Sequence, residues 1–164
     1  MNIDIGEIKK HAIKHFKLES YSIHGEDHWD RVYRNGMAVA RRSGADVMVV
    51  TLFAFLHDSC RWDDGADLEH GKRSAELVMK MQGKIFSIAD TQLILLAEAC
   101  LHHTYGKCSD DPTIGTCWDA DRLDLGRVGI IPNARYMSTM PGREIARLGS
   151  LELYMNSSAG IGQV

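Results

Sequence analysis

Residues 47–58 read VMVVTLFAFLHD and include the longest apolar run of the chain. From Val47 to Leu56 only Thr51 is polar, so a helix formed here would be apolar almost all round and buried. Its β-branched residues would also permit a strand, but its length and the lack of flanking turn signals favour a buried central helix. Asp46 is well placed to cap the N-terminus of that helix.

The segments around this stretch predict further helices. Apolar spacing, capping residues and glycine stops indicate helices over 5–18, 28–42, 68–82, 88–103, 114–126 and 142–154. Strand signals are nearly absent. The sequence therefore predicts an all-α fold: a single domain over 1–164, built as a bundle of six or seven helices. The stretch 156–164 is typical of a partly disordered tail.

Composition excludes several classes of protein. The chain has 164 residues, of which 45% are hydrophobic and 25% charged, as in globular proteins, so disorder is excluded as its main state. A net charge of -3 gives no electrostatic reason to expect nucleic acid or a membrane as a partner, although a local site can still bind a small anion.

The four cysteines form no C-x-x-C pair, which weakens a zinc-ribbon interpretation. The longest apolar stretch is shorter than the ~20 residues that span a bilayer. We expect a reduced, cytoplasmic protein; the sequence decides nothing about a homo-oligomer.

Polar residues stand at the ends of the most apolar predicted helices. His57 and Asp58 end the first of these helices, and His102 and His103 end the second. A charge buried there is costly unless it is paired or bound to a metal. One histidine at a helix end is usually a cap or a surface residue, and one aspartate is usually a cap. Several such residues together, however, indicate a metal-binding site. A ligand set of imidazole and carboxylate suits Zn, Mn, Fe or Ni better than Ca or Mg.

Three segments carry a resemblance to a known family. They read HGEDHWDRVYRNG (24–36), LFAFLHDSCRW (52–62) and CWDADRLDLGRVG (117–129). This H…HD…D pattern resembles the HD domain superfamily of metal-dependent phosphohydrolases, over a core of about 23–129. The resemblance implies His57 and Asp58 as catalytic residues and the metal ligands His28, His57, Asp58 and Asp121. Asp121 is preferred to Asp119 because the family's last ligand precedes Arg-Leu.

Further residues enter through the same resemblance. Asp124 would hold a ligand histidine or pair with Arg127. Many HD proteins carry a wider pattern with two more histidines. By this resemblance, the first matches His70 and the second matches either His103, which we prefer, or His102. These histidines would bind a second metal or the phosphate of the substrate; otherwise they are ordinary helix-end residues. A phosphate could also be held by three basic residues, Lys72, Arg73 and Arg61; the alternative for Lys72 and Arg73 is a solvated helix start.

The activity that the resemblance implies is hydrolysis of a nucleotide or another small phosphate ester or anhydride. It would require one or two divalent ions of Mn, Co, Ni, Fe or Zn, with Mg also compatible. Arg61 stands where alarmone hydrolases and some 5′-nucleotidases of the superfamily carry an acidic residue, which argues against alarmone hydrolysis and weakens the case for a 5′-nucleotidase. Two alternatives are a di-iron oxygenase of the HD type and a non-catalytic sensor of a nucleotide or metal. All four ligand positions of the motif carry the expected histidine or aspartate, which argues against a non-catalytic sensor.

Overall fold

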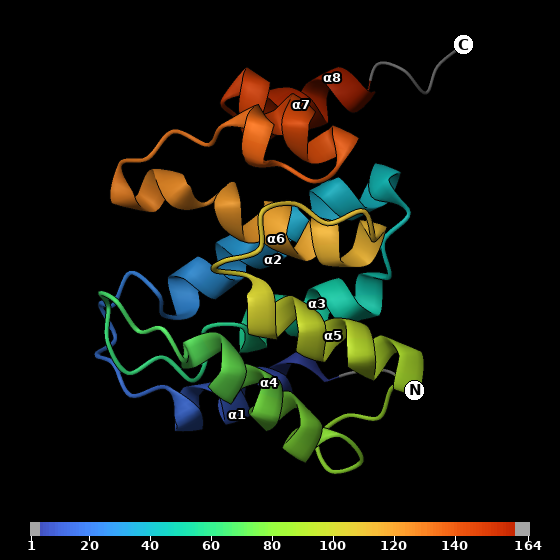
Figure 1. Cartoon of the computed structure of the whole chain (residues 1–164). Helices are drawn as coiled ribbons and strands as arrows, with labels where there is room; N and C mark the ends of the chain where they lie inside the picture. Colours follow the sequence, from blue (N-terminus) through green and yellow to red (C-terminus); the bar gives the residue numbers. More distant parts are fainter. Residues whose placement is uncertain (1–3, 160–164) are drawn as a thin grey trace.

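The computed structural model describes residues 4–159 and shows an all-α bundle, as the sequence predicts (Figure 1). Within these residues there are eight α-helices rather than six or seven, and two short 3-10 helices, η1 and η2. Their bounds are α1 (Ile5–His15), α2 (Glu26–Ser43), α3 (Val47–Leu56), α4 (His70–Met81), α5 (Asp90–His102), α6 (Pro112–Arg122), η1 (Leu125–Val128), η2 (Ala134–Tyr136), α7 (Met140–Leu148) and α8 (Leu151–Ala159).

Helix α3 is the centre of the bundle. It packs against α1, α2, α5 and α6, and every residue from Val49 to Leu56 is buried. Asp46 caps it by accepting hydrogen bonds from the backbone N–H groups of Met48 and Val49. Val47 is exposed and Met48 is half-buried, because both lie in the first turn of the helix. A buried apolar helix of this kind carries the two polar residues that follow it into the interior.

Several predicted helix bounds were wrong. Helix α2 begins at Glu26 with Gly25 as N-cap, so Asp27 lies inside its first turn. Helix α4 begins at His70 instead of 68, because the carboxylate of Asp67 accepts from the backbone of Trp62 and from Arg73. The predicted helix 142–154 is two helices, since Gly149 adopts a left-handed conformation (φ 67°) that ends α7. Of the predicted tail, 156–159 belong to α8, and 160–164 lie outside the described residues.

Helices α7 and α8 lie together at one end of the molecule, whereas α1 and α4 lie at the other end (Figure 1). The buried carboxylate of Asp119 on α6 holds the start of α7. It accepts hydrogen bonds from the backbone N–H groups of Ser138 and Thr139 (2.6 and 2.8 Å) and from the hydroxyl of Thr139 (2.8 Å). Among the described residues, no helix is both long enough and apolar enough to cross a membrane.

Candidate metal centre

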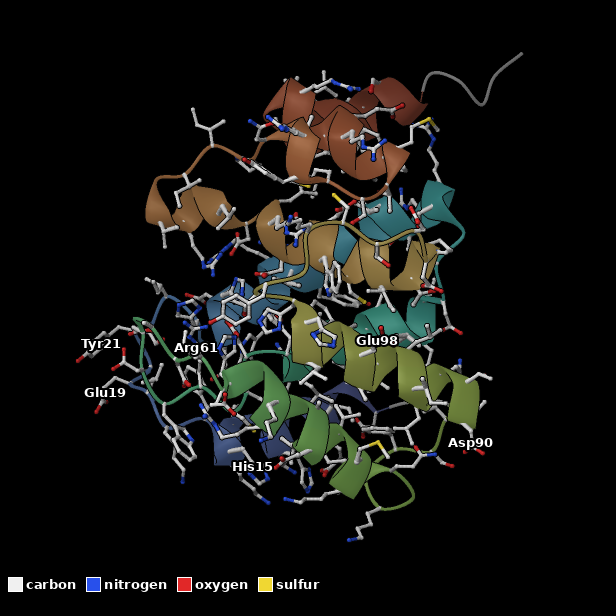
Figure 2. The ribbon with its side chains drawn as sticks, viewed as in Figure 1. His15, Glu19, Tyr21, Arg61, Asp90 and Glu98 are labelled. Carbon is white, nitrogen blue, oxygen red and sulfur yellow. The ribbon has the colours of Figure 1, made fainter. Side chains whose placement is uncertain are left out.

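The ends of five helices bring histidines and aspartates together. His28 lies in the first turn of α2, and His57 and Asp58 directly follow α3. His70 opens α4, His103 follows α5, and Asp121 lies in the last turn of α6. Arg61, labelled in Figure 2, marks this side of the bundle; the loop before α2, with Glu19 and Tyr21, lies on the same side.

Four of these side chains surround one point, and we call them the His28 group: His28, His57, Asp121 and the Oδ2 atom of Asp58. Nε2 of His28 lies 3.1 Å from Nε2 of His57 and 3.4 Å from Oδ1 of Asp121. Oδ2 of Asp58 lies 3.7 Å from Nε2 of His28 and 3.8 Å from Nε2 of His57. Both rings are fully buried. Ligand atoms of His28, His57 and Asp121 lie close enough together to hold one metal ion.

The opposite nitrogen of each ring in this group is already engaged. Nδ1 of His57 donates to the backbone carbonyl of Phe53 (3.1 Å), and Nδ1 of His28 donates to Oδ2 of Asp124 (2.7 Å). With the proton of each neutral ring on Nδ1, the lone pairs of the two Nε2 atoms face each other. Two lone pairs at that distance repel unless a proton or a cation lies between them. The arrangement therefore fits a metal ion, and the hydrogen bond with Asp124 fixes the orientation of the His28 ring.

A second set, the His70 group, consists of His70, His103 and the other oxygen of Asp58, Oδ1. Nε2 of His70 and Nε2 of His103 lie 2.9 Å apart, and Oδ1 of Asp58 lies 3.2 Å from the first and 3.4 Å from the second. Nδ1 of His103 donates to the carbonyl of Cys100, and Nδ1 of His70 to that of Asp67. Asp58 thus turns one oxygen toward each group. Among the described residues, its buried Oδ1 has no hydrogen-bond partner of good geometry, which is costly without a cation nearby.

The ionisation of the cluster suits a cation. Burial lowers the pKa of His57 to about 3, so this ring is neutral at neutral pH. Burial alone would raise the pKa of Asp58, but electrostatic attraction from the surrounding histidines, His57 foremost, holds it well below its usual value. Burial opposes ionisation of Asp121 too, yet the hydrogen bond with His28 lowers its pKa. A neutral imidazole with two ionised carboxylates is the ligand set that a divalent metal requires.

One residue of the cluster escaped the sequence analysis. Nδ1 of His24 lies 2.9 Å from Oδ2 of Asp58, and His24, His28 and Asp58 form another set able to hold an ion. His24 stands four residues before His28 in the segment HGEDH, but in the loop before α2 rather than on its face. Its only signal in the sequence is that proximity, because a loop has no periodicity to show where a side chain points.

The predicted phosphate-binding residues divide into two sets. Arg61 reaches the cluster: its Nη1 lies 3.1 Å from Nε2 of His70 and 3.6 Å from Oδ1 of Asp58. Lys72 and Arg73 do not line the cavity beside it. Lys72 is exposed and lies 3.7 Å from Glu69, and Arg73 binds Asp67 and the carbonyl of Cys60. The structure therefore does not bring Lys72 and Arg73 to the cluster, because the first turn of α4 directs only His70 inward.

His102, the alternative to His103, lies apart from the cluster. It is exposed, whereas His103, the next residue, is buried in the His70 group. Successive residues of a helix point about 100° apart, so only one of the pair can face the cluster. Asp119 and Asp121 divide in the same way, because Asp121 faces the His28 group and Asp119 faces the start of α7.

An open cavity of about 460 Å³ lies over the cluster. His24, Asp58, Arg61, His103 and Asp121 line it together with residues that the sequence did not single out for it: Thr104, Gly106, Lys107, Arg122, Leu125, Arg127 and Tyr136. Arg122 donates to the carbonyls of Gly106, Lys107 and Tyr136, and Arg127 donates to those of Ile23 and Asp124. These two arginines therefore fix the loops that form the cavity.

Comparison with known proteins supports the fold. A scan against models of protein families finds no match, and a search of curated proteins finds none either. Among solved structures, the chain is similar to a predicted HD superfamily hydrolase from an uncultured Thermotogales bacterium, with 24% identity and a TM-score of 0.68. The match covers 96% of this chain and 92% of the other. The chain thus has an HD-domain-like fold, with a buried cluster of histidines and aspartates that could bind metal ions.

Proposed function

We propose that the chain is a metal-dependent phosphohydrolase that acts on a nucleotide or another small phosphate ester or anhydride. The observation that carries this proposal is the His28 group, in which the lone pairs of two ring nitrogens face each other with no proton donor between them. The group lies beneath a cavity whose lining includes basic residues. A cation site beside an anion-binding cavity is the arrangement that phosphoryl transfer requires. The HD-like fold supports it by analogy.

His28, His57, Asp58 and Asp121 would hold the ion, and mixed imidazole and carboxylate donors favour Mn, Co, Ni, Fe or Zn, with Mg also compatible. When bound, such an ion supplies Lewis-acid chemistry by polarising a phosphoryl oxygen and activating water. Asp124 keeps Nδ1 of His28 protonated, and Arg31 in turn donates to Asp124 (2.7 Å). This chain of hydrogen bonds keeps Nε2 of His28 free as a ligand.

Two residues of the cavity are suited to proton handling. Asp58, whose pKa is held low, stays ionised and can accept a hydrogen bond from the attacking water through Oδ1. Burial lowers the pKa of His103, but the carboxylate of Asp58 beside it outweighs burial and raises it. His103 can therefore carry a proton near neutral pH and give it to the leaving-group oxygen.

Other residues of the cavity would bind the substrate. Arg61 and Lys107 carry the positive charge that attracts phosphate oxygens. Leu125 and Tyr136 offer an apolar wall to the remainder of the substrate, and the ring of a nucleobase could stack on Tyr136. These assignments predict a small phosphorylated substrate with an organic part.

The oxygenase remains the second candidate, because Asp58 turns an oxygen toward each of two histidine groups, as a carboxylate shared by two irons would. The presence of Arg61 in the His70 group counts against it, since a guanidinium repels a second ion. Two bound irons, O₂ uptake and a change in visible absorbance would favour the oxygenase over hydrolysis.

A phosphate-release screen tests the proposal. Metal-stripped protein receives Mn, Co, Ni, Mg, Zn or Fe and is offered nucleoside mono- and triphosphates, cyclic nucleotides and sugar phosphates, with Asp58→Asn beside it. Turnover should require added metal and fall more than about 100-fold in the variant, because a direct ligand matters more than the outer partners of ligands do. Full activity in Asp58→Asn would refute the assignment. Tight nucleotide binding without turnover with any of these metals would favour the sensor.

A further inference from the structure

The two histidine groups differ in one respect that bears on how many ions the site holds. The His70 group contains a cation of the protein itself. Nη1 of Arg61 lies 3.1 Å from Nε2 of His70, within hydrogen-bond distance of the lone pair that a second ion would need. It also lies 3.6 Å from Oδ1 of Asp58, the oxygen without a well-formed hydrogen bond.

Arg61 is fixed in this place. The residue is only 8% exposed. Its Nε donates to the carbonyl of Asp63 (3.2 Å), and its Nη2 donates to the carbonyl of Gly65 (2.9 Å). Both acceptors belong to the loop 59–69, in which Arg61 itself lies. A second ion would therefore have to displace a buried side chain held by two backbone hydrogen bonds, or bind directly beside its charge.

The His28 group has no comparable cation within the part of the chain that the structure describes. The guanidinium groups of Arg31 and Arg127 pair with Asp124, which binds the opposite nitrogen, Nδ1, of the His28 ring, and Nη2 of Arg127 lies 3.4 Å from Nδ1 of His24. The converging atoms of this group are ring nitrogens and carboxylate oxygens alone. Charge repulsion thus opposes an ion in the His70 group but not in the His28 group.

We propose that Arg61 takes the place of a second metal ion, so that the chain binds one divalent ion, in the His28 group. This inference rests on the proposed metal centre. The guanidinium balances the charge of Asp58 Oδ1, as a second ion would, and it also presents N–H donors to a phosphate entering the cavity. The residue three positions after Asp58, here Arg61, would then determine whether the site binds one ion or two.

Counting bound ions tests this inference without measuring turnover. Metal-stripped protein is saturated with Mn²⁺, freed of weakly bound ions, and analysed by elemental analysis and electron paramagnetic resonance. The wild type should hold one ion per chain and show the spectrum of an isolated Mn²⁺. Arg61→Gln should hold two and show a spin-coupled pair, whereas Arg61→Lys, which keeps the charge, should hold one. Two ions in the wild type, or one in a folded Arg61→Gln, would overturn the inference.

Two further variants serve if Arg61→Gln does not fold, and they separate this inference from the proposed function. In the wild-type background, His70→Ala should still hold one Mn²⁺ per chain, and His28→Ala should hold none. A fall from two ions to one in His70→Ala would refute the role of Arg61 but leave the phosphohydrolase standing. If the wild type binds no ion, both proposals fail.

Discussion

Nε2 of His28 and Nε2 of His57 face each other at 3.1 Å in the interior of the bundle, while the other nitrogen of each ring donates to an acceptor. This relationship joins the fold to the proposed chemistry. It is built by two helix ends distant in sequence, the start of α2 and the end of α3. Because the rings are buried, the cluster needs a proton or a cation at this point.

Asp124 should control metal affinity through His28. Asp124→Asn removes a charged acceptor from Nδ1 of His28, and loss of such an outer partner typically weakens metal binding by about 10–100-fold. Titration of stripped protein with Mn²⁺ measures the change.

Asp119→Asn is the matched control, because this aspartate lies on the same helix as Asp121 but binds the backbone that leads into α7. It should lower the free energy of unfolding by roughly 1–3 kcal/mol through its impaired buried hydrogen bonds and leave the affinity for Mn²⁺ unchanged. Equal affinities in the two variants would contradict the role given to Asp124.

Gly71 should be required for the contact between the two histidines of the His70 group. A Cβ atom at Gly71 would lie 2.7 Å from the carbonyl oxygen of Cys100 and 3.0 Å from that of Leu101, so α4 would have to move away from α5. That movement would separate His70 from His103, and overpacking of this kind costs roughly 1–3 kcal/mol. Thermal unfolding measures the loss in Gly71→Ala. Gly126→Ala, where the described part of the chain leaves open space, should unfold like the wild type.

The metal-free protein should lose stability as the pH rises above 6.5. Burial lowers the pKa of His28, but its hydrogen bonds to Asp121 and Asp124 outweigh burial and raise it above 6.5. The proton on His28 thus stabilises the fold fully below pH 6.5, and this stabilisation disappears as the pH passes the raised value. The melting temperature, measured with a chelator, should fall over this range, and less steeply in His28→Gln. With saturating metal the fall should vanish. Identical slopes in the two metal-free proteins would contradict this account.

Lys107 should contribute to substrate binding rather than to catalysis. It lines the cavity over the cluster and is exposed at its mouth. Removing a charged hydrogen-bond donor of this kind should raise KM by about tenfold and leave kcat nearly unchanged. Steady-state kinetics of Lys107→Ala tests this on whichever substrate the screen identifies. Lys72→Ala, an exposed lysine paired with Glu69 outside the cavity, should keep the KM of the wild type.

The sequence was sufficient for features that depend on local pattern. The apolar run from Val47 to Leu56 predicted α3 with its bounds and its cap Asp46, and the motif brought His28, His57, Asp58 and Asp121 to notice before their proximity was known. Which neighbour faces inward was harder to predict, as Lys72 and Arg73 show, because that depends on the rotation of a helix about its axis.

The residues that loops bring to the cavity could not be predicted from the sequence. His24, Lys107, Arg127 and Tyr136 reach the cavity through segments without periodicity, whose course is set by contacts such as that of Arg122 with the carbonyls of Gly106 and Lys107. The place of Arg61 could be suspected from the motif, but its hydrogen bonds to Asp63 and Gly65 could not.

The most direct test of the metal centre is anomalous X-ray scattering from crystals of the protein loaded with Mn²⁺. We expect a peak among His28, His57, Asp58 and Asp121, within roughly 2–2.3 Å of the two Nε2 atoms, as is usual for bonds to transition metals. The absence of a peak in this cluster under saturating metal, or a peak held by His24 without His57, would refute the assignment of the His28 group as the metal centre.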